Sequence, residues 1–270
     1  MNKYSGLLKK FILLTAPVIT SSVLFSTPSK AATFAYSEGY LDFTEFSQSP
    51  LNVVTGTGAE TLAIDIDRGG TVGAIAEAEA YFLIEPAEAE NSSLSAAFGE
   101  NQAYLGVAES EASVIGNFNV DANTNFSFDF FSNLELATSI DNPPQESARV
   151  SGDISFALID RQSNDVLDFF NLAGNITTEG DDDFVALQKS DNVTINQKFD
   201  APGFGGVQEF LTVSIEGELE RFFTEETSLT LIEIERNRAE VKAVVPEASN
   251  SLALFVASGV IGLVLKRRRN

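Results

Sequence analysis

Apolar and polar residues alternate along most of the chain between residues 32 and 244. The clearest stretch is Phe126-Ser127-Phe128-Asp129-Phe130, and the same period of two recurs in 62–67, 154–158 and 211–216. Strict alternation predicts β-strands with one buried and one exposed face. Clusters of Gly, Asn, Asp and Pro separate these segments and predict turns, for example at 141–144.

This pattern predicts about ten short strands, little helix and no internal linker. The segments are 34–46, 62–67, 75–80, 107–112, 126–136 with a bend after Phe130, 154–158 with 166–172 as a hairpin, 184–187, 193–199, 211–215, 229–234 and 239–244. We therefore expect an all-β fold, a single antiparallel β-sandwich of jelly-roll character, in one domain at residues 32–244.

Two of the predicted strands resemble each other. Residues 75–80 and 107–112 both alternate small residues with glutamates, which places the acids of each strand on one sheet face. We predict that the two are antiparallel neighbours, joined by residues 85–102. Two copies are too few for a repeat architecture.

The N-terminus has the features of a secretory signal peptide, residues 1–31. Lys3, Lys9 and Lys10 precede an apolar run at 11–25, and small residues then flank a cleavage site that we place after Ala31. The body of the protein is therefore expected to be exported.

The C-terminal tail, residues 245–270, predicts a membrane segment. Pro246, Glu247 and Ala248 are followed by an apolar run to Leu265, and residues 248–265 would extend about 27 Å as a helix, enough for a span. The cations that follow favour a cytoplasmic end and stop transfer. This basic cluster consists of Lys266, Arg267, Arg268 and Arg269.

This tail resembles the PEP-CTERM sorting signal of Gram-negative bacteria, with Ala248 where the family has a second proline. The resemblance implies an exosortase-type processing enzyme as partner. It also implies an inner-membrane intermediate, a final location at the cell envelope or in the extracellular matrix, and an association with exopolysaccharide or biofilm. A plain single-span anchor is the alternative interpretation.

The body is strongly acidic. It holds nine basic residues, seventeen minus the eight in the two ends, and thirty-eight acids, thirty-nine minus Glu247, for a formal charge of about −29. Nucleic acid and anionic lipid are therefore not expected as partners of the body, because both are bound through Lys and Arg.

The chain has no cysteine and no histidine. Stability must therefore come from the core, for which the many phenylalanines of the body are suited. Catalytic triads, Cys–His pairs and His-ligated zinc are excluded. A glycosidase that uses two carboxylates remains formally open. The chain has no Trp, and only Tyr36, Tyr40, Tyr81 and Tyr104 of the body could stack sugars.

Two acidic turns are candidates for a calcium site, because calcium takes several oxygen ligands from loops. They contain Asp65 with Asp67, and Asp181, Asp182 and Asp183. Solvated turns are the simpler interpretation. No other cofactor is expected.

We therefore expect a non-enzymatic, exported protein with a structural or adhesive role. A carbohydrate-binding module, possibly calcium-dependent, is the alternative, and a carboxylate-based glycoside hydrolase is the third.

Overall fold

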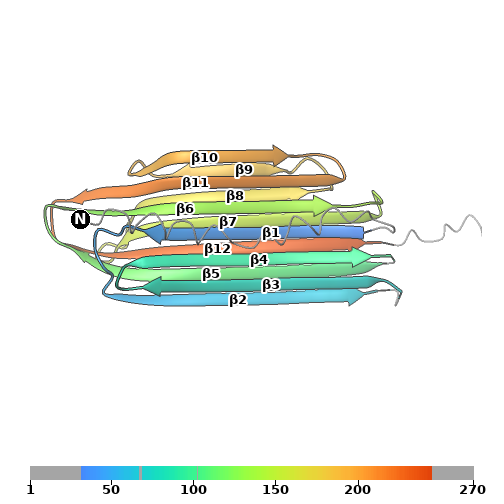
Figure 1. Cartoon of the computed structure of the whole chain (residues 1–270), viewed down its shortest axis with the longest axis horizontal. Coiled ribbons are helices and arrows are strands. Elements are labelled where there is room, and N and C mark those ends of the chain that lie inside the picture. The colour runs from blue at the N-terminus through green and yellow to red at the C-terminus, as the bar shows by residue number, and fades with distance from the viewer. Residues whose placement is uncertain (1–31, 67–68, 102, 245–270) are drawn as a thin grey trace, which may run out of the picture. The chain divides into compact units, whose positions relative to one another are not determined.

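The computed structural model describes residues 32–66, 69–101 and 103–244, which form twelve strands in two six-stranded antiparallel sheets (Figure 1). The expected antiparallel β-sandwich is confirmed. Within these residues, no helix has the length and apolar character needed to cross a membrane.

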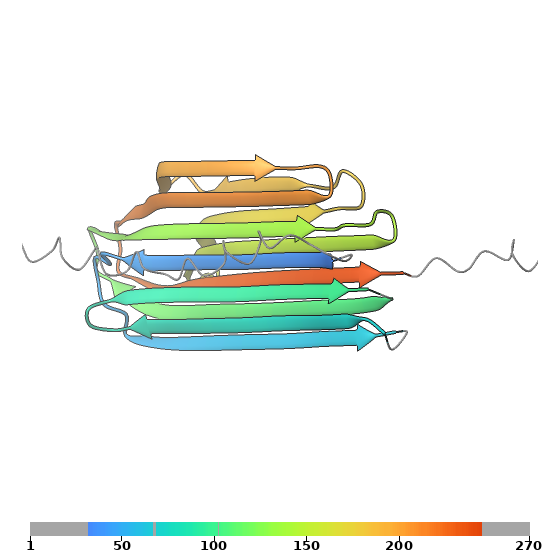
Figure 2. The same cartoon turned by 45° about the vertical axis from the view of Figure 1, so that its right-hand side comes forward.

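Sheet A has the spatial order β10 (Val193–Gly203), β11 (Gln208–Phe223), β6 (Thr124–Ser139), β1 (Ala32–Thr44), β4 (Glu88–Glu100) and β3 (Thr71–Leu83). Sheet B has the order β9 (Phe184–Lys189), β8 (Val166–Thr177), β7 (Glu146–Asp160), β12 (Thr227–Ala243), β5 (Tyr104–Val120) and β2 (Asn52–Asp65). The sheets stack so that β3 faces β2 and β5, β4 faces β5 and β12, and β1 faces β12 and β7 (Figure 2).

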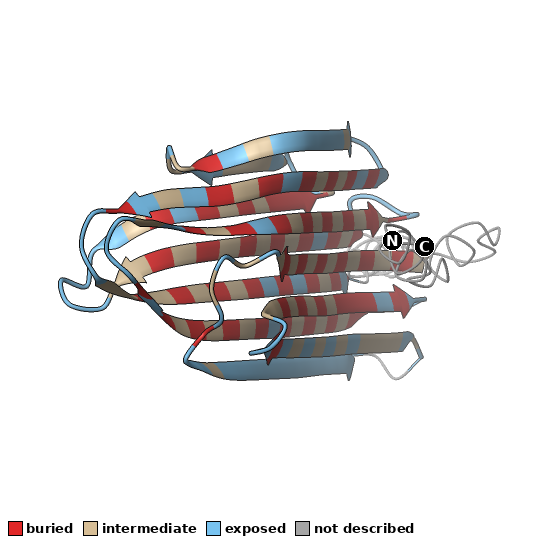
Figure 3. Cartoon of the chain, turned by 60° about the vertical axis from the view of Figure 1, so that its left-hand side comes forward, coloured by how far each residue is buried: buried red, intermediate tan, exposed pale blue. Residues whose placement is uncertain are grey.

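The predicted alternation of buried and exposed residues is confirmed in the longest strands (Figure 3). The bend predicted after Phe130 is wrong, because β6 continues without interruption and simply turns Phe131 outward. The two segments expected at the C-terminal end of the body are one strand, β12. Its middle buries the polar side chains of Glu233, Glu235 and Asn237.

The strand β4 was not predicted, since its inward positions carry Asn91, Ser93 and Ser95 in place of large apolar residues. It fills the stretch that was expected to join the two similar segments. As a result, residues 75–80 lie in β3 of sheet A and residues 107–112 in β5 of sheet B, and the predicted pairing between them is wrong. The glutamates of each segment do share one sheet face, as expected, and that face points away from the core.

The remaining differences concern strand ends. The hairpin of β7 and β8 is confirmed, with a register shift next to Leu158. β2 begins at Asn52, ten residues before the predicted start, and β10 extends through Pro202 to Gly203. Both extensions carry small or polar residues, whose weak alternation conceals a strand.

The space between the sheets is filled in two ways. The aromatic cluster consists of Phe43, Phe46, Phe82, Phe118, Phe126, Phe128, Phe130, Phe156 and Phe170, whose rings contact one another edge to face or stacked. The polar seam, where β1, β4, β5 and β12 meet, consists of Ser37, Ser93, Ser95, Ser110, Glu233, Glu235 and Asn237. The predicted role as core is confirmed for these phenylalanines, whereas others, such as Phe199 and Phe222, are exposed.

Candidate functional site

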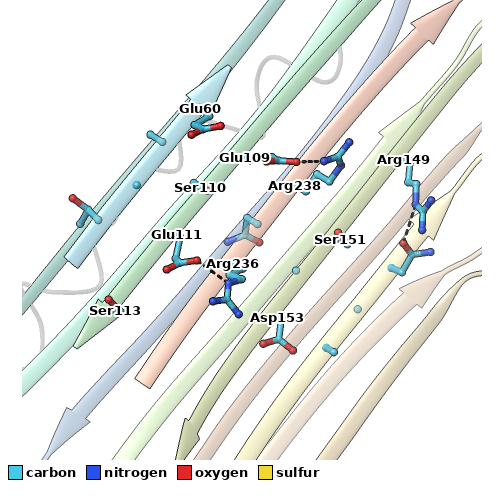
Figure 4. Close-up of a pocket in the computed structure, with 18 of the residues that line it drawn as sticks. Glu60, Glu109, Ser110, Glu111, Ser113, Arg149, Ser151, Asp153, Arg236 and Arg238 are labelled. Atoms are coloured by element: carbon cyan, nitrogen blue, oxygen red, sulfur yellow. Dashed lines mark hydrogen bonds and ion pairs between the residues drawn. The ribbon is translucent and has the colours of Figure 1, made fainter. Parts of the chain in front are cut away.

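A shallow groove of about 1420 Å³ crosses the outer face of sheet B, from β2 through β5, β12 and β7 to β8 (Figure 4). Small residues on the outer face make this hollow. They are Gly56, Gly58, Ser113, Ser151 and Ala173.

The interior below the groove is also built from small residues. Gly152 packs so closely that an added Cβ would lie 2.8 Å from Asn237 Oδ1 and would collide with Leu134. At Gly39 an added Cβ would lie 2.5 Å from Glu235 Oε1. We infer that these glycines let sheet B approach sheet A, which deepens the hollow on the outside.

Charged side chains line the groove in cross-strand rows. One row is Gly58, Glu111, Arg236, Asp153 and Ala173, and the next is Glu60, Glu109, Arg238, Ser151 and Asn175. Both arginines lie on β12, the central strand, and each stands opposite a glutamate of β5. The groove therefore presents hydrogen-bond donors along its middle and acceptors beside them (Figure 4).

The arginines are held by ion pairs. Arg236 Nε donates to Glu111 Oε2 at 2.8 Å, and Arg238 donates to Glu109 and to Glu240. About half of each of the Arg236 and Glu111 side chains is exposed. Exposed pairs of this kind contribute only about 0–1 kcal/mol to stability. The fold therefore gains little stability from these ion pairs.

The third arginine of the groove, Arg149 on β7, lies in the cross-strand row next to that of Arg238 and Ser151. Its Nε donates to Asn175 Oδ1 at 3.4 Å, and in register it stands between Glu240 and Thr177. Three of the nine basic residues of the body thus gather at one surface.

The polar seam lies directly beneath. Ser93 Oγ donates to Glu235 Oε1 at 2.7 Å, and Asn237 Nδ2 donates to Ser93 Oγ at 2.6 Å. Burial raises the pKa of Glu235 to about 8, against the opposing effect of the Ser93 hydrogen bond. Burial also raises the pKa of Glu233 well above its usual value, and Glu235 adds to this. Both carboxyls are inside the protein and cannot meet a ligand in the groove.

The outer face of sheet A differs from the groove. At the outward positions of its described strands there is no Lys or Arg, and Tyr36, Tyr40 and Tyr81 stand there among acids. Tyr81 Oη donates to Glu90 Oε2 at 2.9 Å, and burial together with these carboxylates raises the tyrosine pKa. Tyr104 is buried inside the sandwich. The tyrosines therefore do not line the groove.

Near these tyrosines lies Asp42, on β1. Burial, and then the nearby Glu88 and Glu90, raises the pKa of Asp42 to about 7. The carboxyls with raised pKa values on this face, Asp42 and Glu38, lie on the opposite side of the sandwich from the groove.

The structure does not bring the candidate calcium residues together. Asp65 ends β2, whereas Asp181, Asp182 and Asp183 follow β8, and the strands β5, β12 and β7 lie between them, a separation of roughly 20 Å. Asp183 instead accepts from the backbone N–H of Thr177 at 2.8 Å. Among the described residues, no group of three or more acids is arranged to hold a metal ion. Asp67 lies outside the described residues.

The predicted targeting signals also lie outside the described residues. They are the cleavage site at Ala31, the motif Pro246, Glu247 and Ala248, the apolar segment and the basic cluster Lys266 to Arg269.

No family model, no curated protein and no solved structure matches this chain. The groove residues were not singled out from the sequence. The nearest signal was the paired glutamates of 107–112, which in the structure supply Glu109 and Glu111. The arginines opposite them could be found only by aligning β5 with β12, more than one hundred residues later in the chain.

Proposed function

We propose that the protein is an exported, non-enzymatic adhesive component of the envelope or matrix that binds an extended polar polymer, of the exopolysaccharide class, in the groove of sheet B. The single observation that carries the proposal is the band of arginines and acids across that concave face. Sugar hydroxyls both donate and accept hydrogen bonds, so alternating donors and acceptors match them. The groove crosses five strands, an extent that suits a chain and not a small molecule.

The proposal favours a neutral polymer. The body is acidic overall, and although the groove has arginines at its centre, its five lining acids outnumber its three arginines. We propose jelly-roll character for this sandwich, an architecture that includes lectin domains.

A binding role is favoured over hydrolysis by the state of the groove acids. Glu109 and Glu111 are each paired with an arginine at the surface of the groove. A glycosidase needs one acid of raised pKa in the cleft. The carboxyls of raised pKa that this structure contains lie in the interior or away from the groove.

Residues 1–31 would export the protein and residues 245–270 would sort it. We propose that the PEP-CTERM-like tail brings the body to an exosortase-type enzyme at the inner membrane. Replacement of Pro246 and Glu247 by alanine should leave the protein membrane-bound at its unprocessed mass in a host that has such an enzyme. The same mass and distribution in variant and parent would favour a plain anchor.

Binding is tested with the full-length chain in a mild detergent against dextran as a neutral polymer and alginate as an anionic one. The double variant Arg236→Ala and Arg238→Ala should weaken binding by about tenfold or more. Lys189→Ala with Lys198→Ala is the matched control, since it removes the same charge from strands away from the centre of the groove. Equal weakening in both double variants, or no binding to either polymer, would contradict the proposal.

A further inference from the structure

The edge strands on the two sides of the sandwich differ in how well they are protected against pairing with another chain. β9 and β10 form the edges on one side, and β2 and β3 form them on the other (Figures 1 and 2). An edge strand presents unpaired N–H and C=O groups, and natural proteins block such edges with lysines, prolines, bulges or very short strands.

The side of β9 and β10 is blocked in each of these ways. β9 has only six residues and ends with Lys189. β10 contains Lys198 and Pro202, and its register is interrupted between Ile195 and Gln197.

The side of β2 and β3 has none of these blocks. β2 has 14 residues and β3 has 13, neither contains Lys, Arg or Pro, and both pair with their neighbours in unbroken register. Every residue of β2 except Val53 is exposed (Figure 3). Among them are the apolar residues Val54, Leu62 and Ile64.

We infer that β2 pairs antiparallel with β2 of a second copy of this chain, so that sheet B continues across two molecules. Closed two-fold dimers are the commonest symmetric assembly and require a self-complementary surface. Pairing centred on Gly58 meets this requirement. It places Val54 opposite Leu62 and Glu60 opposite Gly56, with no like charges facing each other.

The neighbouring edge does not offer the same match. β3 carries Glu77 and Glu79 near its middle, so centring its self-pairing there opposes glutamate to glutamate. The two-fold contact is therefore assigned to β2.

The pairing also has a consequence for the groove, which reaches β2 at Gly56, Gly58 and Glu60. In a continuous sheet the two grooves meet end to end at Gly58. A polymer that spans both would gain from two linked sites. This consequence rests on the proposed function, whereas the pairing of β2 does not.

Cysteine cross-linking tests the register, and the natural chain has no cysteine to interfere. Gly58→Cys is suitable because a Cβ at Gly58 meets no heavy atom within 4 Å. Directly opposed residues in antiparallel strands lie about 4.5–5.5 Å apart, within the range for a disulfide. In the full-length chain, kept in mild detergent so that residues 252–265 do not drive association, Gly58→Cys should form disulfide dimers about tenfold faster than Gln197→Cys on β10.

Sedimentation velocity of the natural chain should show a concentration-dependent dimer. Leu62→Lys should raise its dissociation constant by about tenfold, equivalent to 1.4 kcal/mol. Val166→Lys, at another exposed apolar position on β8, should leave the constant unchanged. Equal thermal midpoints for both lysine variants would show that each is folded.

A monomer at all concentrations, or cross-linking at Gln197 as fast as at Gly58, would overturn the inference. These outcomes are separate from failure of polymer binding. A dimer that binds neither dextran nor alginate would leave the β2 pairing standing and contradict the proposed function.

Discussion

Phenylalanine rings fill the part of the interior around β6 and β7, whereas serine, glycine, asparagine and glutamate fill the part where β1, β4 and β12 meet. The aromatic cluster buries much apolar surface, the main favourable term in folding. The polar seam buries little, and its carboxyls are costly to remove from water. Yet the groove lies over the polar seam. The comparison indicates that one part of the interior provides stability and the other provides the shape of the candidate site.

The largest expected difference between the two parts is in their response to pH. Glu235, with its pKa raised from 4.5 to about 8, binds a proton in the folded state that it loses in the unfolded state between these pH values. Its contribution to stability is therefore complete below pH 4.5 and is lost as the pH rises to 8, a change of up to about 5 kcal/mol. Glu233 acts in the same direction.

Urea unfolding of the full-length chain at pH 5, 6, 7 and 8 measures this change. Glu235→Gln mimics the protonated side chain and should reduce the slope by about 1.4 kcal/mol per pH unit. Stability that rises with pH, or a variant with the parent slope, would show that the seam does not titrate with folding.

The aromatic cluster should respond to the loss of a ring. Phe156 contacts Phe43, Phe128, Phe130 and Phe170, and Phe156→Ala should reduce the free energy of unfolding by about 3–5 kcal/mol. Phe222→Ala is the matched control, because Phe222 is exposed on β11, and should change it by about 0.5 kcal/mol or less. Similar losses in both variants would mean that the cluster does not dominate stability.

The close packing of Gly152 against the polar seam is tested by adding one methyl group. Gly152→Ala places its Cβ against Leu134 and Asn237 and should cost about 1–3 kcal/mol, because the sheets must separate. It should also weaken polymer binding, since the groove would become shallower. Val207→Ile, which adds one carbon at an exposed position outside the groove, should change neither quantity. Weakened binding in both variants would show that polymer binding does not depend on the spacing of the sheets at Gly152.

The same contrast explains which strands can be predicted from the sequence and which cannot. Where large apolar residues alternate with polar ones, as in β6, the strand and its buried face are predicted. Where the buried residues are themselves small or polar, as in β4 and the middle of β12, the pattern disappears. The groove depends on both kinds of strand and on pairing between residues 109–111 and 236–238. No single segment of the sequence determines the register between strands so far apart in the chain.

The smallest effect concerns a single hydroxyl group of the polar seam. Ser93→Ala removes the donor to Glu235 Oε1 and the acceptor of Asn237 Nδ2, and should cost about 1 kcal/mol in urea unfolding at pH 5. Ser92→Ala, the neighbouring outward position on β4, should cost less. The Ser93 hydrogen bond opposes the effect of burial on Glu235, so its loss should raise the pKa of Glu235 further. The decline of stability should therefore extend to higher pH in Ser93→Ala than in the parent. An unchanged pH profile would mean that burial alone sets the protonation of the seam.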